Sequence, residues 1–206
     1  NVIDDNNGTI SEDPLNEVFT SLELGLKLRS DDGAVVGNVN YYNTQWKDRN
    51  QVKYVSSGSS DGADAMVFLT GVNQNHSGFE VEGSAQLSSM FTLNGAVSYA
   101  NWQFDGDASG NYKEYTDTTT NVTDYVYALD GLYVGDSPQS QLVLGGTITP
   151  IDGLKIQGLY NFYDRNFADW SPGSREIGDD GDADRAQVWE APDYSRIDLH
   201  AYYDLP

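Results

Sequence analysis

The feature that most constrains this chain is an alternation of apolar and polar side chains, repeated in four runs of about ten residues. In the clearest run, Leu24 lies between Glu23 and Gly25, and the alternation continues on both sides. A period of two puts alternate side chains on opposite faces of a β-strand. This pattern is typical of transmembrane β-barrel strands, with one face in lipid and one facing a wet interior, although a water-soluble sandwich uses it too. The runs are residues 22–29, 79–87, 154–162 and 196–204.

Composition agrees with an all-β chain. Among 206 residues, 38% are hydrophobic, and no apolar stretch approaches the roughly 18 residues that a membrane helix requires. The absence of cysteine excludes a disulfide framework and thiolate metal sites. The first residues lack a basic and apolar export signal, so we expect any signal to lie upstream of Asn1 or to have been removed. With a formal charge of −21, we expect no nucleic-acid partner.

Turn signals divide the chain into about seven predicted strands. Three connections are short, at residues 31–33, 88–90 and 150–153, and they fall on one side of the predicted sheet. The long connections, at residues 49–77, 105–138 and 169–194, fall on the other side together with residues 1–17. Segregated short turns and long loops are typical of outer-membrane barrels, whose long loops face outside. The predicted strands are residues 18–30, 34–48, 78–88, 91–104, 139–149, 154–168 and 195–205.

The alternation also predicts which side chains face lipid. Each apolar set should share one face of the sheet, and the polar set should line the interior. The side chains expected to face lipid are Leu22, Leu24, Leu26, Phe79, Val81, Leu87, Ile156, Tyr160 and Leu199.

Negative charge is concentrated in the long connections. Residues 1–17, 105–138 and 169–194 carry formal charges of −5, −6 and −6, which is −17 of the total −21. One interpretation is that these loops are solvated and repel anions generally. The alternative is that they hold divalent cations, for their own order or to bridge to anionic lipid. A loose calcium site is predicted at Asp180, Asp182 and Asp184, although Arg185 and Ala191 stand where a helix-loop-helix calcium loop has Gly and Glu.

Signals of catalysis are weak. Residues 58–62 match the Gly-x-Ser-x-Gly string, but polar loop surrounds them where a nucleophile elbow needs a strand and a helix. His76 and His200 lie in different predicted elements and are expected to be polar barrel or loop residues. We therefore expect no catalytic residues and no resident cofactor, apart from the calcium hypothesis.

An ordered series of segments resembles one family. Residues 71–82 resemble the Asn-Val-Gly-…-Gly-Val-Glu-x-Glu segment in the barrel of TonB-dependent outer-membrane receptors. As in that family, there follow a hairpin at residues 91–95, an acidic loop, and a Gly-…-Pro strand entry at residues 135–138. The turn at residues 150–154 and a Tyr-rich strand that ends at Phe167-Ala168-Asp169 complete the series. The resemblance extends over most of residues 15–205.

This resemblance implies an outer-membrane transporter of Gram-negative bacteria. Family members have barrels of about 22 strands closed by an N-terminal plug. They capture iron-siderophore complexes, cobalamin or glycans and move them inward with energy supplied by an inner-membrane protein. Seven strands cannot form such a barrel, and an odd number leaves open edges in lipid. We therefore expect residues 1–206 to be one partial barrel domain, with the plug and closing strands outside this chain. Its expected partners are the solute, the rest of the barrel and plug, the coupling protein and membrane lipid.

Aromatic side chains cluster toward the long-loop ends of the predicted strands. Most should belong to the interfacial girdle, where rings rest among lipid headgroups. Those on the inward phase are candidates to stack on a sugar or siderophore ring. Their positions in the alternation direct the side chains of Trp102 and Phe104 inward, whereas the direction of the Trp46 side chain stays undetermined. The predicted ligand-binding residues are Trp102, Phe104, Trp46, Tyr163 and Trp170.

Two other functions use the same patterns. A passive or adhesive outer-membrane barrel would need no plug domain. A secreted carbohydrate-binding β-protein would alternate apolar and polar residues without any membrane, and it would stay in solution without detergent.

Overall fold

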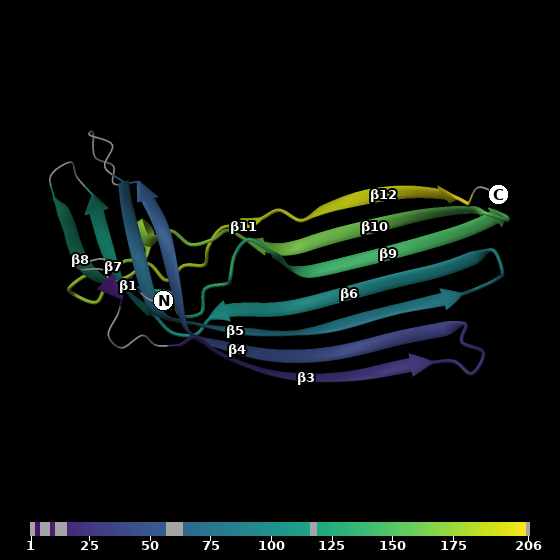
Figure 1. The fold of residues 1–206 in the computed structure, drawn as a ribbon, viewed down its shortest axis with the longest axis horizontal. Helices are drawn as coiled ribbons and strands as arrows, with labels where there is room; N and C mark the ends of the chain where they lie inside the picture. Colours follow the sequence, from purple (N-terminus) through teal and green to yellow (C-terminus); the bar gives the residue numbers. More distant parts are fainter. Residues whose placement is uncertain (1–2, 5–8, 11–15, 57–63, 116–118, 205–206) are drawn as a thin grey trace.

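The computed structural model describes residues 3–4, 9–10, 16–56, 64–115 and 119–204. Within them, seven long antiparallel strands form one sheet in the order β3-β4-β5-β6-β9-β10-β12 (Figure 1). This confirms the predicted all-β, antiparallel fold. The strands are β3 (Val18–Arg29), β4 (Val35–Ser56), β5 (Asp64–Gln86), β6 (Phe91–Phe104), β9 (Pro138–Ile151), β10 (Leu154–Phe167) and β12 (Tyr194–Tyr203).

The register sorts apolar and polar side chains onto opposite faces of this sheet. Leu26, Val39, Val81 and Val97 are successive cross-strand partners from β3 to β6, and Leu142 of β9 continues the row. One residue farther along each strand, the other face carries polar side chains such as Glu82. The shared face of the residues predicted to contact lipid is therefore confirmed for those within the strands, whereas Leu87 lies one residue beyond the end of β5. We call this the apolar face, and the opposite one the polar face.

The two ends of the sheet differ as predicted. The turns β3–β4, β5–β6 and β9–β10 lie together at the right in Figure 1, which we call the short-turn end. The longer connections lie at the opposite, long-loop end. Within the described residues the sheet does not close on itself, because β3 pairs only with β4 and β12 only with β10. An open sheet is what we predicted for part of a larger barrel.

The prediction of a long loop at residues 49–77 is wrong. Strand β4 continues to Ser56 and β5 begins at Asp64, so most of that segment is paired strand. Irregular pairing in β4 around Arg49, with Asp48 and Gly71 at positive φ (57° and 68°), shifts the alternation of both strands. Such bulges interrupt the period-two pattern without ending the strand, which explains the misassignment.

Strands also interrupt the predicted loop 105–138. It contains β7 (Ala108–Tyr115) and β8 (Thr120–Tyr127), a hairpin whose first strand pairs with residues 65–70 of β5. Beyond the main sheet, the extended ends of β4 and β5 therefore continue into β7 and β8 as a four-stranded layer at the long-loop end (Figure 1). The prediction of a long loop over all of residues 105–138 is therefore wrong.

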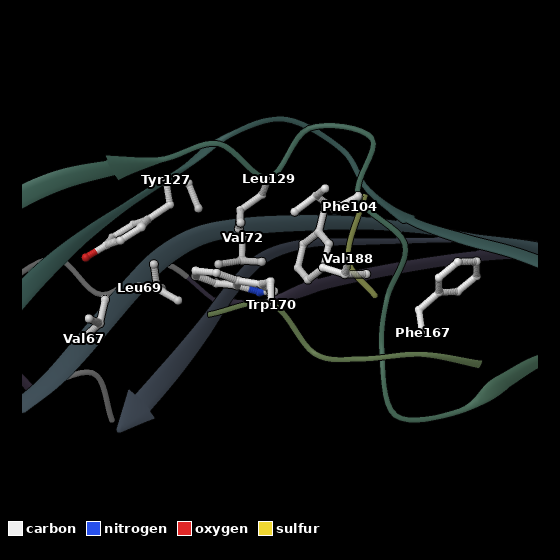
Figure 2. Packing of buried hydrophobic residues seen from close by; sticks show 11 residues of the cluster. Val67, Leu69, Val72, Phe104, Tyr127, Leu129, Phe167, Trp170 and Val188 are labelled. Atoms are coloured by element: carbon white, nitrogen blue, oxygen red, sulfur yellow. The ribbon is translucent and has the colours of Figure 1, made fainter. Parts of the chain in front are cut away.

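A hydrophobic cluster packs against this layer (Figure 2). The bulges turn Leu69 and Val67 of β5 to the same side as Val72, and all three are almost fully buried. Trp170, from the connection after β10, packs with its ring 5.7 Å from that of Tyr127 and 6.4 Å from that of Phe104. Burial of these large side chains provides the hydrophobic driving force for folding this end of the molecule. The cluster comprises Val67, Leu69, Val72, Phe104, Ala108, Tyr127, Leu129, Leu132, Phe167, Trp170 and Val188.

Polar contacts fix the connection between β10 and β12 to this cluster. Lys53 of β4 binds the carboxylate of Asp169 and lies with its Nζ 4.4 Å from the centre of the Trp170 ring. The carbonyl of buried Arg175 accepts from the N–H of Ala128 at 2.8 Å, and its guanidinium donates to the carbonyls of Asp184 and Ala186 within the connection at 2.8 and 2.7 Å. The connection is thus tied down at both its start and its middle, as expected for a loop that carries buried residues.

Four short elements complete the described structure: β1 (Ile3–Asp4), β2 (Thr9–Ile10), the 3-10 turn η1 (Pro172–Ser174) and β11 (Glu190–Ala191). β1 pairs with β2, and β11 with the end of β10.

Among the described residues there is no helix that is long and apolar enough to cross a membrane.

Candidate functional site

Aromatic and hydrogen-bonding side chains gather on the polar face, just below the hydrophobic cluster. They come from three adjacent strands, β4, β5 and β6, whose register brings them side by side. We call this group the inner-wall cluster; it consists of Tyr42, Trp46, Arg49, Gln74, His76 and Trp102.

Trp102 is the centre of this group. Its Nε1 donates a hydrogen bond of 2.9 Å to the hydroxyl of Tyr42, two strands away. Its ring centre lies 5.5 Å from that of His76, its cross-strand partner in β5. Since Tyr42 belongs to the polar face, this contact agrees with the inward direction that parity predicted for Trp102. The indole is partly buried.

A buried side chain fixes the backbone of Trp102. Pairing between β6 and β9 ends at Tyr99 and Ser140, and beyond it the Trp102 carbonyl accepts from the Val134 N–H at 2.9 Å. Gln139 completes the backbone bonding of Trp102: its Oε1 accepts from the Trp102 N–H at 2.9 Å, and its Nε2 donates to the Trp102 carbonyl at 3.1 Å. Gln139 is 1% exposed. It therefore holds the main chain of Trp102 in the extended form that directs the indole along the wall.

The upper part of the inner-wall cluster is polar and charged. Trp46 donates from Nε1 to Glu17 at 3.0 Å, and the Arg49 guanidinium lies 4.1 Å from the centre of the Trp46 ring. Arg49 also donates to Oε1 of Gln74 at 3.3 Å, which lies 3.1 Å from Nε2 of His76. The register pairs Trp46 with Gln74, which assigns it to the polar face and resolves the direction that parity left open.

The other predicted ligand-binding residues lie elsewhere. Phe104 and Trp170 are each 4% exposed inside the hydrophobic cluster. Tyr163 of β10 stacks on Tyr194 of β12 with ring centres 4.9 Å apart, across the sheet from Trp102. Of the five predicted residues, the structure thus places Trp46 and Trp102 in the inner-wall cluster and packs Phe104 against Trp170 in the hydrophobic cluster. Ligand contact by any of the five stays a prediction.

The predicted calcium residues lie in an exposed turn. Asp180 accepts from the backbone N–H of Asp182 at 3.1 Å, and Asp184 accepts from that of Ala186 at 2.9 Å. Arg175 lies 3.7 Å from the Asp184 carboxylate. Within the described ranges, no group of three or more His, Cys, Asp or Glu side chains is arranged to hold a metal ion. The calcium site stays a prediction.

The weak catalytic candidates remain separate. The Gly-x-Ser-x-Gly string, residues 58–62, lies outside the described residues, together with residues 57 and 63. His76 belongs to the inner-wall cluster, whereas His200 lies in β12 beside the ring of Tyr202, at 6.2 Å between centres.

Sequence reasoning singled out only Trp46 and Trp102 of this site, and two of the residues that it missed show why. Tyr42 lies on the polar phase of β4, so the alternation itself could have marked it as an inward-facing aromatic residue. Gln139 has no such signal, because its role depends on where the β6–β9 pairing stops.

A hollow of about 330 Å³ opens on the polar face next to Tyr42. Its polar lining comes from Glu23 of β3, Asn40 of β4 and Glu80 of β5. Aromatic rings beside carboxylate and amide groups form a surface that can stack a ring and bind its hydroxyl groups.

No curated protein and no solved structure matches this chain. A family model does match it, over residues 5–206: the TonB dependent receptor-like β-barrel. This match spans nearly all of the strands described above, and the family is one of outer-membrane proteins. The apolar face is then the lipid face, the polar face lines the barrel interior, and the long-loop end is extracellular. The chain belongs to the TonB-dependent receptor family, as part of the β-barrel wall of a receptor in the bacterial outer membrane.

Proposed function

We propose that this wall serves energy-coupled uptake of a scarce solute of the iron-siderophore, vitamin or glycan class. The single observation that supports it best is Trp102, a partly buried indole on the interior face that is fixed by Gln139 and Tyr42. A large ring held rigidly at the extracellular side of a barrel interior is suited to capture a solute, since little conformational entropy is lost on binding. Family membership supports the general role of receptor and transporter.

The proposed partners follow from the same role. A plug within the barrel and an inner-membrane energy-coupling protein would convert capture into inward movement, because the outer membrane itself supplies no energy source. We propose no catalysis, since the inner-wall cluster offers aromatic rings, one amide and one guanidinium, and no nucleophile paired with a base.

The test uses the full-length receptor in cells and in detergent. Energy-dependent uptake of a solute, abolished by a protonophore, is the expected result for the wild type. Trp102→Ala should weaken solute binding by about 1–3 kcal/mol, taking truncation of a buried aromatic anchor as the guide. Phe104→Ala is the matched control, because Phe104 lies in the hydrophobic cluster. It should lower the unfolding temperature with little effect on affinity.

Uptake that persists without an energized inner membrane would contradict the proposal and favour a passive barrel. Unchanged affinity with a lower unfolding temperature in Trp102→Ala would assign that indole to packing.

A further inference from the structure

Tyr42 lies across the neighbouring strand, and a glycine makes this possible. Tyr42 of β4 pairs with Gly78 of β5, which pairs in turn with Ala100 of β6. A Cβ atom added to Gly78 would lie 2.6 Å from the Tyr42 hydroxyl oxygen and 2.7 Å from its Cζ. Real Cβ atoms do not approach other atoms so closely. Any side chain at position 78 would therefore push the Tyr42 ring off its path.

The crossing brings Tyr42 to Trp102. Beyond Gly78, the Tyr42 hydroxyl accepts the hydrogen bond from Trp102 Nε1. The phenol and indole thus span β4 to β6 along the wall, instead of projecting side by side into the interior. One face of the Tyr42 ring lies against Gly78, so its other face is turned toward the barrel interior.

The same arrangement occurs twice more on this face, with amides in place of the ring. A Cβ at Gly25 would lie 2.5 Å from Asn40 Oδ1, and one at Gly145 would lie 2.5 Å from Asn94 Nδ2. Asn40 therefore lies across β3 in the same way that Tyr42 lies across β5. Asn40 also lines the hollow beside Tyr42.

The hollow determines what can occupy the space next to the ring. Glu23, Glu80 and Asn40 line it on the polar face. Carboxylates accept hydrogen bonds from hydroxyl groups, and an amide both donates and accepts. No Lys or Arg lines this hollow among the described residues. Two carboxylates without a cation disfavour an anionic solute such as a ferric catecholate. A neutral ring with several hydroxyl groups suits this site in two ways. Its C–H face can stack on the Tyr42 phenol, and its hydroxyl groups can bond to the carboxylates and the amide.

We propose that Tyr42, held across Gly78, is the stacking surface for a neutral hydroxylated ring of the solute, that is, a sugar ring. Glu23, Asn40 and Glu80 bind its hydroxyl groups. This inference rests on the proposed function, and it narrows the solute to an uncharged carbohydrate.

The experiment measures calorimetric binding to the full-length receptor in detergent. The probes are neutral hexose oligosaccharides of several linkages, hexagalacturonic acid as an anionic sugar, and a ferric tris-catecholate. The wild type should bind at least one neutral oligosaccharide and bind the anionic probes more weakly. Gly78→Ala and Tyr42→Ala should each weaken that binding by about tenfold, the upper range for one aromatic contact. Tyr42→Phe keeps the aromatic ring and should lose less binding affinity than Tyr42→Ala.

Gly145→Ala is the matched control, because it displaces Asn94 and leaves Tyr42 in place. It should bind like the wild type, and unfolding temperatures should show that both glycine variants remain folded. Wild-type affinity in Gly78→Ala and Tyr42→Ala would overturn the inference. Binding of the ferric complex alone would overturn it as well, while the proposed uptake function would stand. Binding of no neutral oligosaccharide also overturns the inference, and loss of energy-dependent uptake in cells is the separate result that would overturn the function.

Discussion

At the residue scale, Gln139 shows how one buried side chain completes backbone bonding where strand pairing ends. Gln139→Ala would remove the acceptor of the Trp102 N–H and the donor to the Val134 carbonyl, which Gln139 binds at 3.1 Å, whereas the Trp102 carbonyl would keep its bond from the Val134 N–H at 2.9 Å. An unsatisfied buried polar group costs about 1–3 kcal/mol, so we expect a loss of that order in the free energy of unfolding. Urea unfolding of the receptor, followed by tryptophan fluorescence, measures it.

Gln141→Ala is the control, since Gln141 is less buried and donates only to its own strand's Pro138 carbonyl. Equal destabilisation by the two variants would show that Gln139 has no special role.

Asp107 provides a second prediction at this scale. It accepts two hydrogen bonds from Arg185, at 3.0 and 2.7 Å, and two more from the backbone of residues 129 and 130. The bonds from Arg185 are the main reason that the pKa of the Asp107 carboxyl is lowered. The unfolded chain therefore binds this proton more readily than the folded one. The stabilisation that Asp107 contributes is fully present above the ordinary carboxyl pKa of 3.8. It is lost as the pH falls through the lowered pKa of the folded state.

Hydrogen exchange of residues 183–188 measures this effect. Protection in the wild type should fall as the solution is acidified below pH 3.8, whereas Asp107→Asn should have weak protection at every pH. Asp105→Asn should behave like the wild type. A wild-type protein whose protection does not change with acid would contradict the assignment.

At the scale of elements, Gly71 allows β5 to continue past its bulge. Its φ of 68° lies in the left-handed region, and an added Cβ would meet no atom within 4 Å. Gly71→Ala therefore tests backbone strain without a steric clash, and we expect about 1–2 kcal/mol of destabilisation. Thermal unfolding is the measurement. Gly173→Ala is the control, because position 173 is equally open and has no positive φ. A similar change in both variants would refute the role of the bulge.

The alternation within β3 gives a prediction for the membrane face. Leu24 lies on the apolar face and Glu23 on the polar face of the same strand. Leu24→Lys should destabilise the barrel in lipid by about 2–4 kcal/mol, the cost of a cation near the bilayer midplane. Glu23→Lys should cost much less, since its side chain meets water. Folding titrations in vesicles compare the two. A larger effect at Glu23 would reverse the assignment of the faces.

At the scale of the whole molecule, three segments carry −17 of the formal charge of −21, and the described parts of two of them, residues 105–138 and 169–194, lie at the long-loop end. If these segments hold divalent cations, calcium should slow proteolysis within residues 105–138 or 171–193 more than sodium chloride of equal ionic strength, because sodium only screens. The comparison is made with and without a chelator. Identical cleavage under all conditions would favour solvated loops that repel anions.

The sequence by itself determined the membrane part of the fold. A period of two admits only a strand with two unlike faces, so the seven long strands, their turns at residues 31–33 and 88–90 and the phase of Leu24 or Val81 could be predicted. The same parity correctly turned Trp102 toward the interior. Local pattern was sufficient there because every residue in a regular strand inherits its direction from its neighbours.

Only the tertiary structure decided the extracellular end and the composition of the site. The bulges near Asp48 and Gly71 reverse the parity of β4 and β5, so Leu69 and Val67 become core residues that the alternation could not assign. Burial of Phe104 and Trp170 depends on the connection after β10, which brings Trp170 against Phe104 of β6 and Lys53 of β4. The contact between Tyr42 and Trp102 depends on register and on the absence of a side chain at Gly78. These arrangements arise from contacts between residues distant in sequence, and a period-two pattern carries no information about them.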